Sequence, residues 1–225
     1  MIVIKGISWI FQGEYGCVKN GIRYDYSNIK SLSSKLKNEN IVHYPIKDFG
    51  RLDTISKLTC CSIALAMFDA GLPYNEHDNQ DIGIVGTNSN GCLQSNFDYF
   101  KDYVENGRKL ARGNLFIYTL PTSPLAEAAI HFGCQGPLLY ITSAGKIISS
   151  LLKCAEQLML DQNINKMLAI AADEEKSICF VLIREKNGLS EKICGLQDIV
   201  DITEKGASLE ENIKDIIKDN INKKL

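Results

Sequence analysis

The stretch GPLLYITSAGKIISSLL, residues 136–152, changes from a strand pattern to a helix pattern across a turn of small residues. Leu138 to Ile141 is apolar and β-prone, TSAG forms the turn, and an apolar helical pattern begins at Lys146. Such a turn exposes one side chain, and the free N–H groups of the helix N-terminus attract anions. Many α/β enzymes carry a nucleophile at this kind of elbow, but Gly145 at its tip has no side chain.

Two phosphate-binding motifs can be excluded near this elbow and its neighbours. A P-loop needs a glycine five residues before Gly145 and Ser or Thr after Lys146, where the chain has Tyr140 and Ile147. The glycines of DIGIVGTNSNG, residues 81–91, lack the spacing of a dinucleotide-binding fingerprint. We therefore expect no nucleotide cofactor.

Histidines and cysteines give no complete catalytic or metal-binding pattern. None of the three histidines lies in H-E-x-x-H, although His131 or His77 could act as a base if the fold brought it to the elbow. The eight cysteines include no C-x-x-C pair, and most lie in apolar runs, as expected of buried free thiols. The sequence predicts no metal site. An acidic run, Asp173, Glu174 and Glu175, follows an apolar stretch. Such a run more commonly forms a solvated loop than a ligand site.

The composition is that of a globular protein without a charged field. The net charge is -2, and hydrophobic residues make up 45% of the 225 residues. This balance argues against nonspecific nucleic-acid binding. The N-terminus lacks the features of a signal peptide, and no run approaches the roughly 18 apolar residues of a membrane span. We expect a cytoplasmic protein.

Strand and helix patterns alternate along the chain. Strands are predicted at residues 2–11, 81–87, 138–141 and 166–172, and the Asn187-Gly188 turn predicts a hairpin within residues 177–196. Helices are predicted at 27–37, 54–70 between Asp53 and Gly71, 95–106, 123–132 with Ser123 as N-cap, and 146–160. This order indicates an α/β, three-layer α/β/α fold with a mixed, mostly parallel five-stranded sheet and an antiparallel edge hairpin.

The chain is expected to form one main domain over residues 1–200. Residues 201–225 should add an amphipathic helix, with a capping box at Ser208 and Glu211 and an apolar stripe. Packing of this helix on the same domain is the more common outcome, and docking on a partner is the alternative.

Several segments, read in order, resemble the N-terminal half of the β-ketoacyl synthases, condensing enzymes with a thiolase-like fold. These segments are VIKGISWI, GRLDTISKLTCCSIALAMFDAGL, IGIVGTNSNG, TLPTSPLAEAAIHFGCQGP and NKMLAIAADE, and the resemblance covers roughly Met1 to Arg184. In this family the nucleophilic cysteine lies eight residues beyond the proline of a Gly-Pro pair. Counting from Pro137 leads to Gly145, so the resemblance implies that the nucleophile is replaced by glycine.

The resemblance implies a protein without condensation chemistry. The family's second half, which repeats the fold and carries two catalytic histidines, has no counterpart in the sequence, and without cysteine and histidines no covalent acyl enzyme is expected. The implied role is a non-catalytic accessory protein of fatty acid or polyketide biosynthesis that binds an acyl chain, an acyl carrier protein or a partner synthase. The alternative is an acyl-thioester hydrolase or acyltransferase that uses a different nucleophile on the same scaffold.

The resemblance also assigns candidate contact residues. The vestigial elbow, and the loop after the preceding strand, provide candidates for acyl or anion binding: Thr142, Ser143, Gly145, Lys146, Thr87 and Asn88. In the family the strand before the elbow lies at the two-fold dimer interface, which implies a homodimer, or a heterodimer with a synthase, through Leu138, Leu139, Tyr140 and Ile141.

Overall fold

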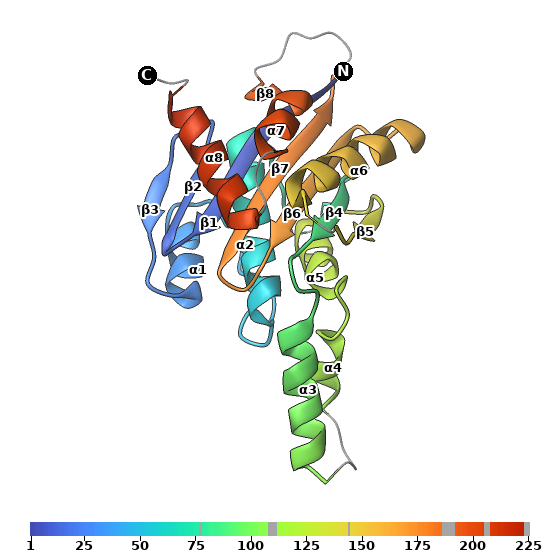
Figure 1. Cartoon of the computed structure of the whole chain (residues 1–225). Coiled ribbons are helices and arrows are strands. Elements are labelled where there is room, and N and C mark those ends of the chain that lie inside the picture. Colours follow the sequence, from blue (N-terminus) through green and yellow to red (C-terminus); the bar gives the residue numbers. More distant parts are fainter. Residues whose placement is uncertain (77, 108–111, 144, 186–191, 205–207, 223–225) are drawn as a thin grey trace.

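The computed structural model describes residues 1–76, 78–107, 112–143, 145–185, 192–204 and 208–222, with side chains described up to residue 218. A twisted sheet lies between two layers of helices, and a pair of helices projects from one end of the molecule (Figure 1). The predicted three-layer α/β/α class is confirmed.

Five strands form the centre of the sheet in the order β1-β7-β6-β4-β5. They are β1 (Ile2–Phe11), β4 (Gly83–Thr87), β5 (Leu138–Tyr140), β6 (Lys166–Ala172) and β7 (Lys176–Arg184). Strand β4 pairs parallel with β5 and β6, whereas β7 runs antiparallel to both β6 and β1. Four of the five strands therefore run in one direction, as expected for a mixed, mostly parallel sheet.

The predicted edge hairpin around Asn187-Gly188 is wrong as a strand pairing. Both sides of β7 are occupied by β1 and β6, so the short β8 (Cys194–Gly195) pairs with β1 instead. The turn itself lies outside the described residues. An antiparallel edge does exist, but β2 (Glu14–Cys17) and β3 (Arg23–Asp25) form it beside β1, in a segment whose polar residues gave no strand signal. The described strands of the sheet therefore number eight, not five.

One face of the sheet is covered by α1 (Ile29–Asn38), α2 (Thr54–Ala70) and α5 (Ser123–Phe132). The predicted limits of α2 are confirmed: the Asp53 carboxylate accepts a hydrogen bond of 2.8 Å from the Ser56 N–H, and Gly71 ends the helix in the left-handed conformation. Helix α2 lies so close to β1 that a Cβ at Gly6 would be only 2.4 Å from the Ala66 carbonyl oxygen. The N-cap of α5 is Thr122, one residue earlier than predicted.

The opposite face is covered by α6 (Ile147–Asp161), α7 (Leu196–Thr203) and α8 (Leu209–Asn222). Leu209, Ile213 and Ile216 of α8 are buried in the same apolar cluster as the β1 side chains. The predicted capping box is present, with the Glu211 N–H donating to Ser208 Oγ at 3.2 Å and the Ser208 N–H donating to the Glu211 carboxylate at 3.1 Å. The C-terminal helices thus complete the layer that α6 begins.

Helices α3 (Leu93–Glu105) and α4 (Gly113–Ile117) form a projection that we call the arm (Figure 1). The sequence predicted α3 two residues too late and missed the short α4. Among the described elements, α3 packs mainly on α4. In the described ranges, no helix combines the length and the apolar character needed to cross a membrane.

Candidate functional site

The predicted elbow is present at the carboxyl end of β5. The strand ends at Tyr140, and α6 begins at Ile147. Between them Gly145 has φ +97° and Lys146 has φ 47°, so the turn needs two consecutive residues with positive φ. Gly145 is exposed, and a Cβ added to it would meet no atom within 4 Å. The glycine is therefore required by backbone conformation and not by lack of space.

The hydroxyl groups of the elbow do not form a nucleophile. Ser143 Oγ donates to the Gly145 carbonyl and also lies 3.0 Å from Ser150 Oγ, so it closes the turn onto the first turn of α6. Thr142 is exposed to solvent. A nucleophilic hydroxyl needs an adjacent base, whereas the contacts of Ser143 Oγ are to another hydroxyl and a carbonyl.

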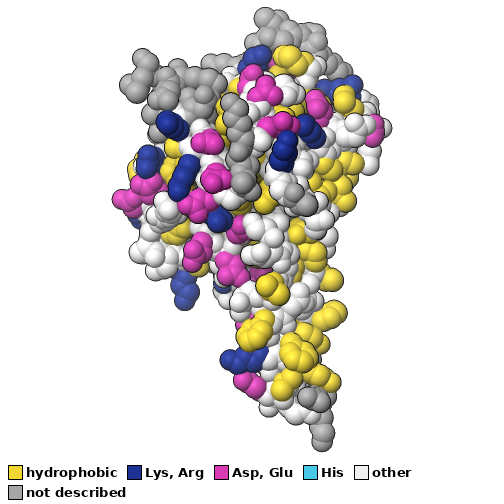
Figure 2. Space-filling view, viewed as in Figure 1, with side chains coloured by type: hydrophobic (Ala, Val, Ile, Leu, Met, Phe, Trp, Pro, Cys, Tyr) yellow, Lys and Arg dark blue, Asp and Glu magenta, His cyan; other side chains and the backbone are white. Residues whose placement is uncertain are grey.

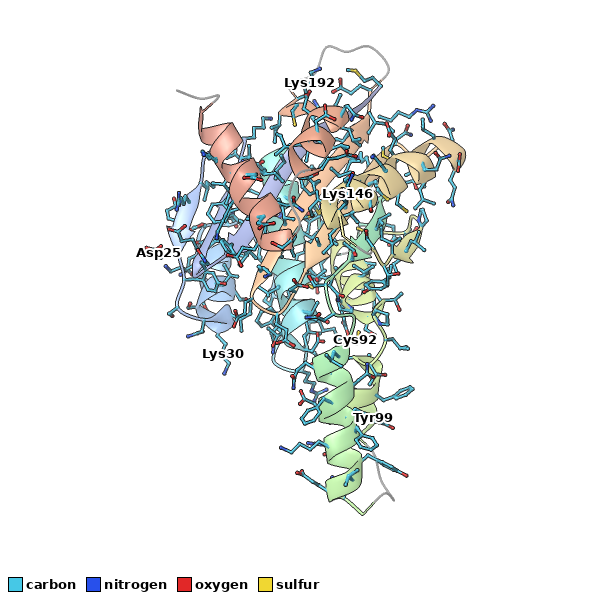
Figure 3. All side chains as sticks on the ribbon, in the orientation of Figure 1. Asp25, Lys30, Cys92, Tyr99, Lys146 and Lys192 are labelled. Carbon is cyan, nitrogen blue, oxygen red and sulfur yellow. The ribbon has the colours of Figure 1, made fainter. Side chains whose placement is uncertain are left out.

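The cationic side chain of the elbow is partly neutralised by the C-terminal region. Lys146 Nζ lies 3.6 Å from Glu204, and Lys153 Nζ lies 2.9 Å from the same carboxylate. The hydrogen bond from Lys153, together with the charge of Lys146, lowers the pKa of Glu204. Figure 3 shows Lys146 at the start of α6. The elbow therefore presents one excess positive charge next to the free N–H groups of a helix N-terminus.

The loop after β4 is held by the candidate residue Asn88. Its side-chain oxygen accepts hydrogen bonds from the Gly91 N–H at 2.6 Å and from the Tyr140 hydroxyl at 2.8 Å, while its NH₂ group donates to the Gly91 carbonyl at 3.0 Å. Asn88 thus connects the ends of β4 and β5. With these three hydrogen bonds made, it acts as a structural residue in this conformation.

Thr87, the other candidate after β4, lines a cavity that is too small for an acyl chain. Thr87 is buried and its hydroxyl has no hydrogen-bond partner among the described residues. The cavity next to it has a volume of about 10 Å³ and is lined by residues that include Thr59, Pro121, Leu125 and Tyr140. This space holds about one water molecule. The cavity next to Thr87 is therefore closed to an acyl chain in this conformation.

In the acidic run after β6, Asp173 makes a structural contact, whereas Glu174 and Glu175 are exposed to solvent. Asp173 accepts hydrogen bonds of 2.8 Å from both the N–H and the hydroxyl of Ser89, and so fixes the loop after β4. Glu174 and Glu175 line two surface clefts of about 500 and 340 Å³ on either side of the β6–β7 turn. Lys176 lines both clefts and lies 3.9 Å from Glu210. The carboxylates thus face solvent beside a lysine.

Of the two histidine candidates, the described one, His131, does not reach the elbow. His131 lies at the C-terminal end of α5, before β5 begins, whereas Gly145 lies beyond the end of β5. Its ring packs against Tyr44, Tyr74 and Phe132, and burial lowers its pKa to about 4. His131 is therefore a neutral core residue at the opposite end of the strand. His77 lies outside the described residues.

Cys92, Cys134 and Cys154 have the raised pKa of unreactive thiols. Burial raises the pKa of Cys92 to about 11 and that of Cys134 to about 12, and it also raises the pKa of Cys154 on α6. A reactive cysteine needs a lowered pKa, because the thiolate is the nucleophile. Within the part of the chain that is described, no group of three or more His, Cys, Asp and Glu side chains is arranged to bind a metal ion.

The outer edge of β5 carries no partner strand among the described residues. Leu138 and Tyr140 are partly exposed, and Leu139 is 38% exposed. Because the Ile141 N–H donates to Gly86 of β4, the Tyr140 N–H points to the outer side of the sheet. The dimer-interface candidates thus form an open strand edge that can add another strand.

Sequence reasoning missed the side chains that close the site. Glu204 directly follows α7 and Ser150 lies on α6, and each contacts a candidate residue of the elbow. Tyr140 was predicted only as part of the dimer edge, but its hydroxyl also donates to Asn88. No motif marks such partners, because their role depends on the packing of separate elements.

Known proteins with a similar fold are found among solved structures, but not by sequence comparison. No protein-family model matches the chain, and no curated protein sequence matches it either. Among solved structures, the ishigamide ketosynthase/chain length factor matches with a TM-score of 0.60 and 14% identity over 85% of this chain and 64% of that chain. A complex of a type II polyketide synthase acyl-carrier protein with its ketosynthase matches with a TM-score of 0.55 and 12% identity over 81% of this chain and 57% of that chain.

A third match is a complex of a ketosynthase with its chain length factor from Xenorhabdus doucetiae. It has a TM-score of 0.53 and 15% identity over 83% of this chain and 80% of that chain. The chain therefore has the α/β fold of ketosynthases and chain length factors, and it spans less than two thirds of the first of these structures. At these identities the similarity establishes the fold alone, and activity has to be argued from the site.

Proposed function

We propose that this protein is a non-catalytic, ketosynthase-like accessory partner in polyketide or fatty acid biosynthesis. The observation that carries the proposal is the elbow itself: its geometry is kept, but its tip is Gly145, and Ser143 is bonded within the turn. The neighbouring structures include a ketosynthase with its chain length factor and one with its acyl-carrier protein, which supports a role through protein contacts.

The closed cavity favours a protein partner over an acyl chain as the ligand. A space of about 10 Å³ beside Thr87 cannot accept an acyl chain unless α5 or the loop after β4 moves. The alternative function, an acyl-thioester hydrolase or acyltransferase, needs a nucleophile next to a base. His131 is remote from the elbow and five of the eight cysteines are buried, with the other three partly buried, so no observation favours that alternative.

The open edge of β5 is the proposed contact with a synthase or with a second copy. Pairing of Leu138–Tyr140 with a strand of the partner would satisfy the outward backbone groups and bury Leu139. Thr142, Gly145 and Lys146 are the exposed elbow residues, and we propose them as the contact for an anionic group of a carrier protein or acyl thioester.

Intact-mass spectrometry tests the absence of catalysis. The protein is incubated with acyl and malonyl thioesters, and a ketosynthase of the same class serves as the positive control. We expect no covalent adduct and no turnover, because no activated nucleophile lies at the elbow. A stoichiometric adduct or multiple turnovers would show that the protein is an enzyme.

Co-purification with a ketosynthase and an acyl carrier protein from the same biosynthetic system tests the partner. Leu139→Glu should abolish binding to the synthase, since a charge would be placed at the paired edge. Leu160→Glu, at a residue of α6 that is 50% exposed, serves as the control and should bind normally. Failure of the wild-type protein to bind either partner would contradict the proposed function.

A further inference from the structure

The arm has an apolar face that nothing described in the structure covers. Leu93, Phe97, Phe100 and Val104 are between 39% and 69% exposed, and we call this set the α3 stripe. Their spacing of four, three and four residues places all four on one side of the helix. Figure 2 shows hydrophobic side chains gathered along the projecting arm. An exposed stripe of this kind marks a protein-interaction surface.

The opposite face of α3 already has its partner. Tyr99 packs on Phe116 of α4 with ring centroids 5.6 Å apart, and Asp102 forms an ion pair of 2.5 Å with Arg112. Ser95 donates a hydrogen bond of 3.1 Å to Asp53 at the start of α2. These residues lie about half a turn away from the α3 stripe. Helix α3 therefore contacts α4 and the start of α2 through one face and presents the other face to solvent.

The α3 stripe has the spacing of a helix-pairing seam. Leu93 and Phe100 occupy d positions of a heptad, and Phe97 and Val104 occupy a positions. In an antiparallel pair of such helices, a positions meet d positions. Phe97 would then face Phe100 of a second copy, and Leu93 would face Val104 of that copy. The stripe is thus complementary to itself about a two-fold axis.

The charges beside the α3 stripe agree with the same arrangement. Asp98 and Lys101 lie on one flank of the helix, and an antiparallel pair brings this flank against the same flank of the second copy. Each Lys101, which also lies 3.9 Å from Glu105 of its own helix, then lies next to Asp98 of the other copy, so the charges of the two Asp98 and two Lys101 side chains sum to zero. In a parallel pair Lys101 would instead face Asn96, with no opposite charge. Antiparallel pairing also places the two bodies at opposite ends of the arms.

We propose that the arm is a self-association surface, on which the α3 helices of two copies of this chain pack antiparallel through Leu93, Phe97, Phe100 and Val104. This surface is separate from the β5 edge, and it does not depend on the proposed function. A dimer through the arms leaves each β5 edge accessible to a further strand.

The first experiment measures the dimer dissociation constant by analytical ultracentrifugation of the full chain. We expect wild-type protein to be dimeric at about 100 μM, within the micromolar range of weak specific association. Phe97→Glu/Phe100→Glu should weaken the dimer by at least about 30-fold, as expected when central aromatic contacts are lost. Leu160→Glu is the control and should leave the constant unchanged. All proteins are also measured in the Leu139→Glu background, so that pairing at β5 cannot mask the result.

The second experiment tests the orientation with charge swaps that do not touch the apolar residues. Asp98→Lys and Lys101→Asp each place four like charges around the axis, and each should weaken the dimer about 10-fold. The double variant restores a neutral set and should recover near wild-type association. Circular dichroism checks that all variants are folded.

Three outcomes would overturn the proposal. The first is a wild-type chain that stays monomeric at about 100 μM, which includes the case in which the α3 stripe binds only a different protein. The second is a dimer whose dissociation constant is unaffected by Phe97→Glu/Phe100→Glu. The third is a double charge variant that associates no better than the single variants.

Discussion

At the scale of single residues, Gly145 combines a demanding backbone conformation with an open environment. Its φ of +97° disfavours any L side chain, although a Cβ would meet no neighbouring atom. The elbow can therefore persist without the side chain that such turns display in enzymes. Its shape depends on glycine and on the Ser143 and Ser150 hydroxyls, which join the turn to α6.

Gly145→Ala should lower the free energy of unfolding by about 1–2 kcal/mol, because alanine is strained at positive φ. Denaturant titration followed by circular dichroism measures this change. Gly50→Ala is the matched control, since Gly50 also has an open Cβ position but no positive φ. Equal stabilities of the two variants would show that the turn relaxes without cost.

His131 should make stability depend on pH. Its folded pKa of about 4 lies below the ordinary value of 6.5 because the ring is buried. Between these values the unfolded chain binds more protons, so the free energy of unfolding decreases as the pH falls. From pH 7 to pH 5 the loss attributable to His131 should be about 2 kcal/mol. In His131→Phe this part of the pH dependence should disappear; parallel profiles for the two proteins would contradict the assignment.

At the scale of elements, α7 and α8 cover the face of the sheet on which α6 also packs. Residues of both helices share one apolar cluster with β1, β6, β7 and α6. Glu204 at the end of α7 also holds Lys146 and Lys153 of the elbow region. We propose that the C-terminal segment, predicted at residues 201–225, belongs with the main domain in function as well, since α7 and α8 cover the sheet and Glu204 contacts the elbow lysines.

Ile213→Ala tests whether α8 is an integral part of the fold. Ile213 is fully buried, so the cavity should lower the free energy of unfolding by about 2–5 kcal/mol. Leu160→Ala, at an exposed residue of α6, should change it by less than about 0.5 kcal/mol. Chemical denaturation of both variants gives the comparison. A near-neutral Ile213→Ala would indicate that α8 detaches readily from the sheet.

At the scale of the whole molecule, the protein offers two surfaces to partners at different places. The β5 edge presents unpaired backbone groups, and the arm presents the α3 stripe. The first suits addition of a strand, and the second suits helix packing. Both surfaces fit the proposed accessory role, in which the protein acts through its contacts with partners.

Self-association should make thermal stability depend on protein concentration. Binding between folded copies stabilises the folded state by mass action, so a 100-fold rise in concentration should raise the Tm by about 3 °C. Differential scanning calorimetry of wild-type protein and Phe97→Glu/Phe100→Glu provides the measurement. The variant should show no such increase; an equal increase in both would assign the effect to another surface.

The sequence by itself determined the elements whose signals are local. Asp53 and Gly71 marked the ends of α2, the apolar runs marked β1 and β6, and Ser208 with Glu211 marked the start of α8. It also located the elbow and the missing side chain at Gly145, because both depend only on the order of neighbouring residues.

Tertiary structure alone decided which elements pair and which side chains meet. β8 pairs with β1 because both sides of β7 are taken. β2 becomes a strand because β1 offers it an edge, and β3 pairs in turn with β2. His131 is separated from the elbow by the length of β5, and the α3 stripe remains exposed because only the other face of α3 has a partner. Such contacts join residues far apart in the chain, where local spacing carries no information about distance.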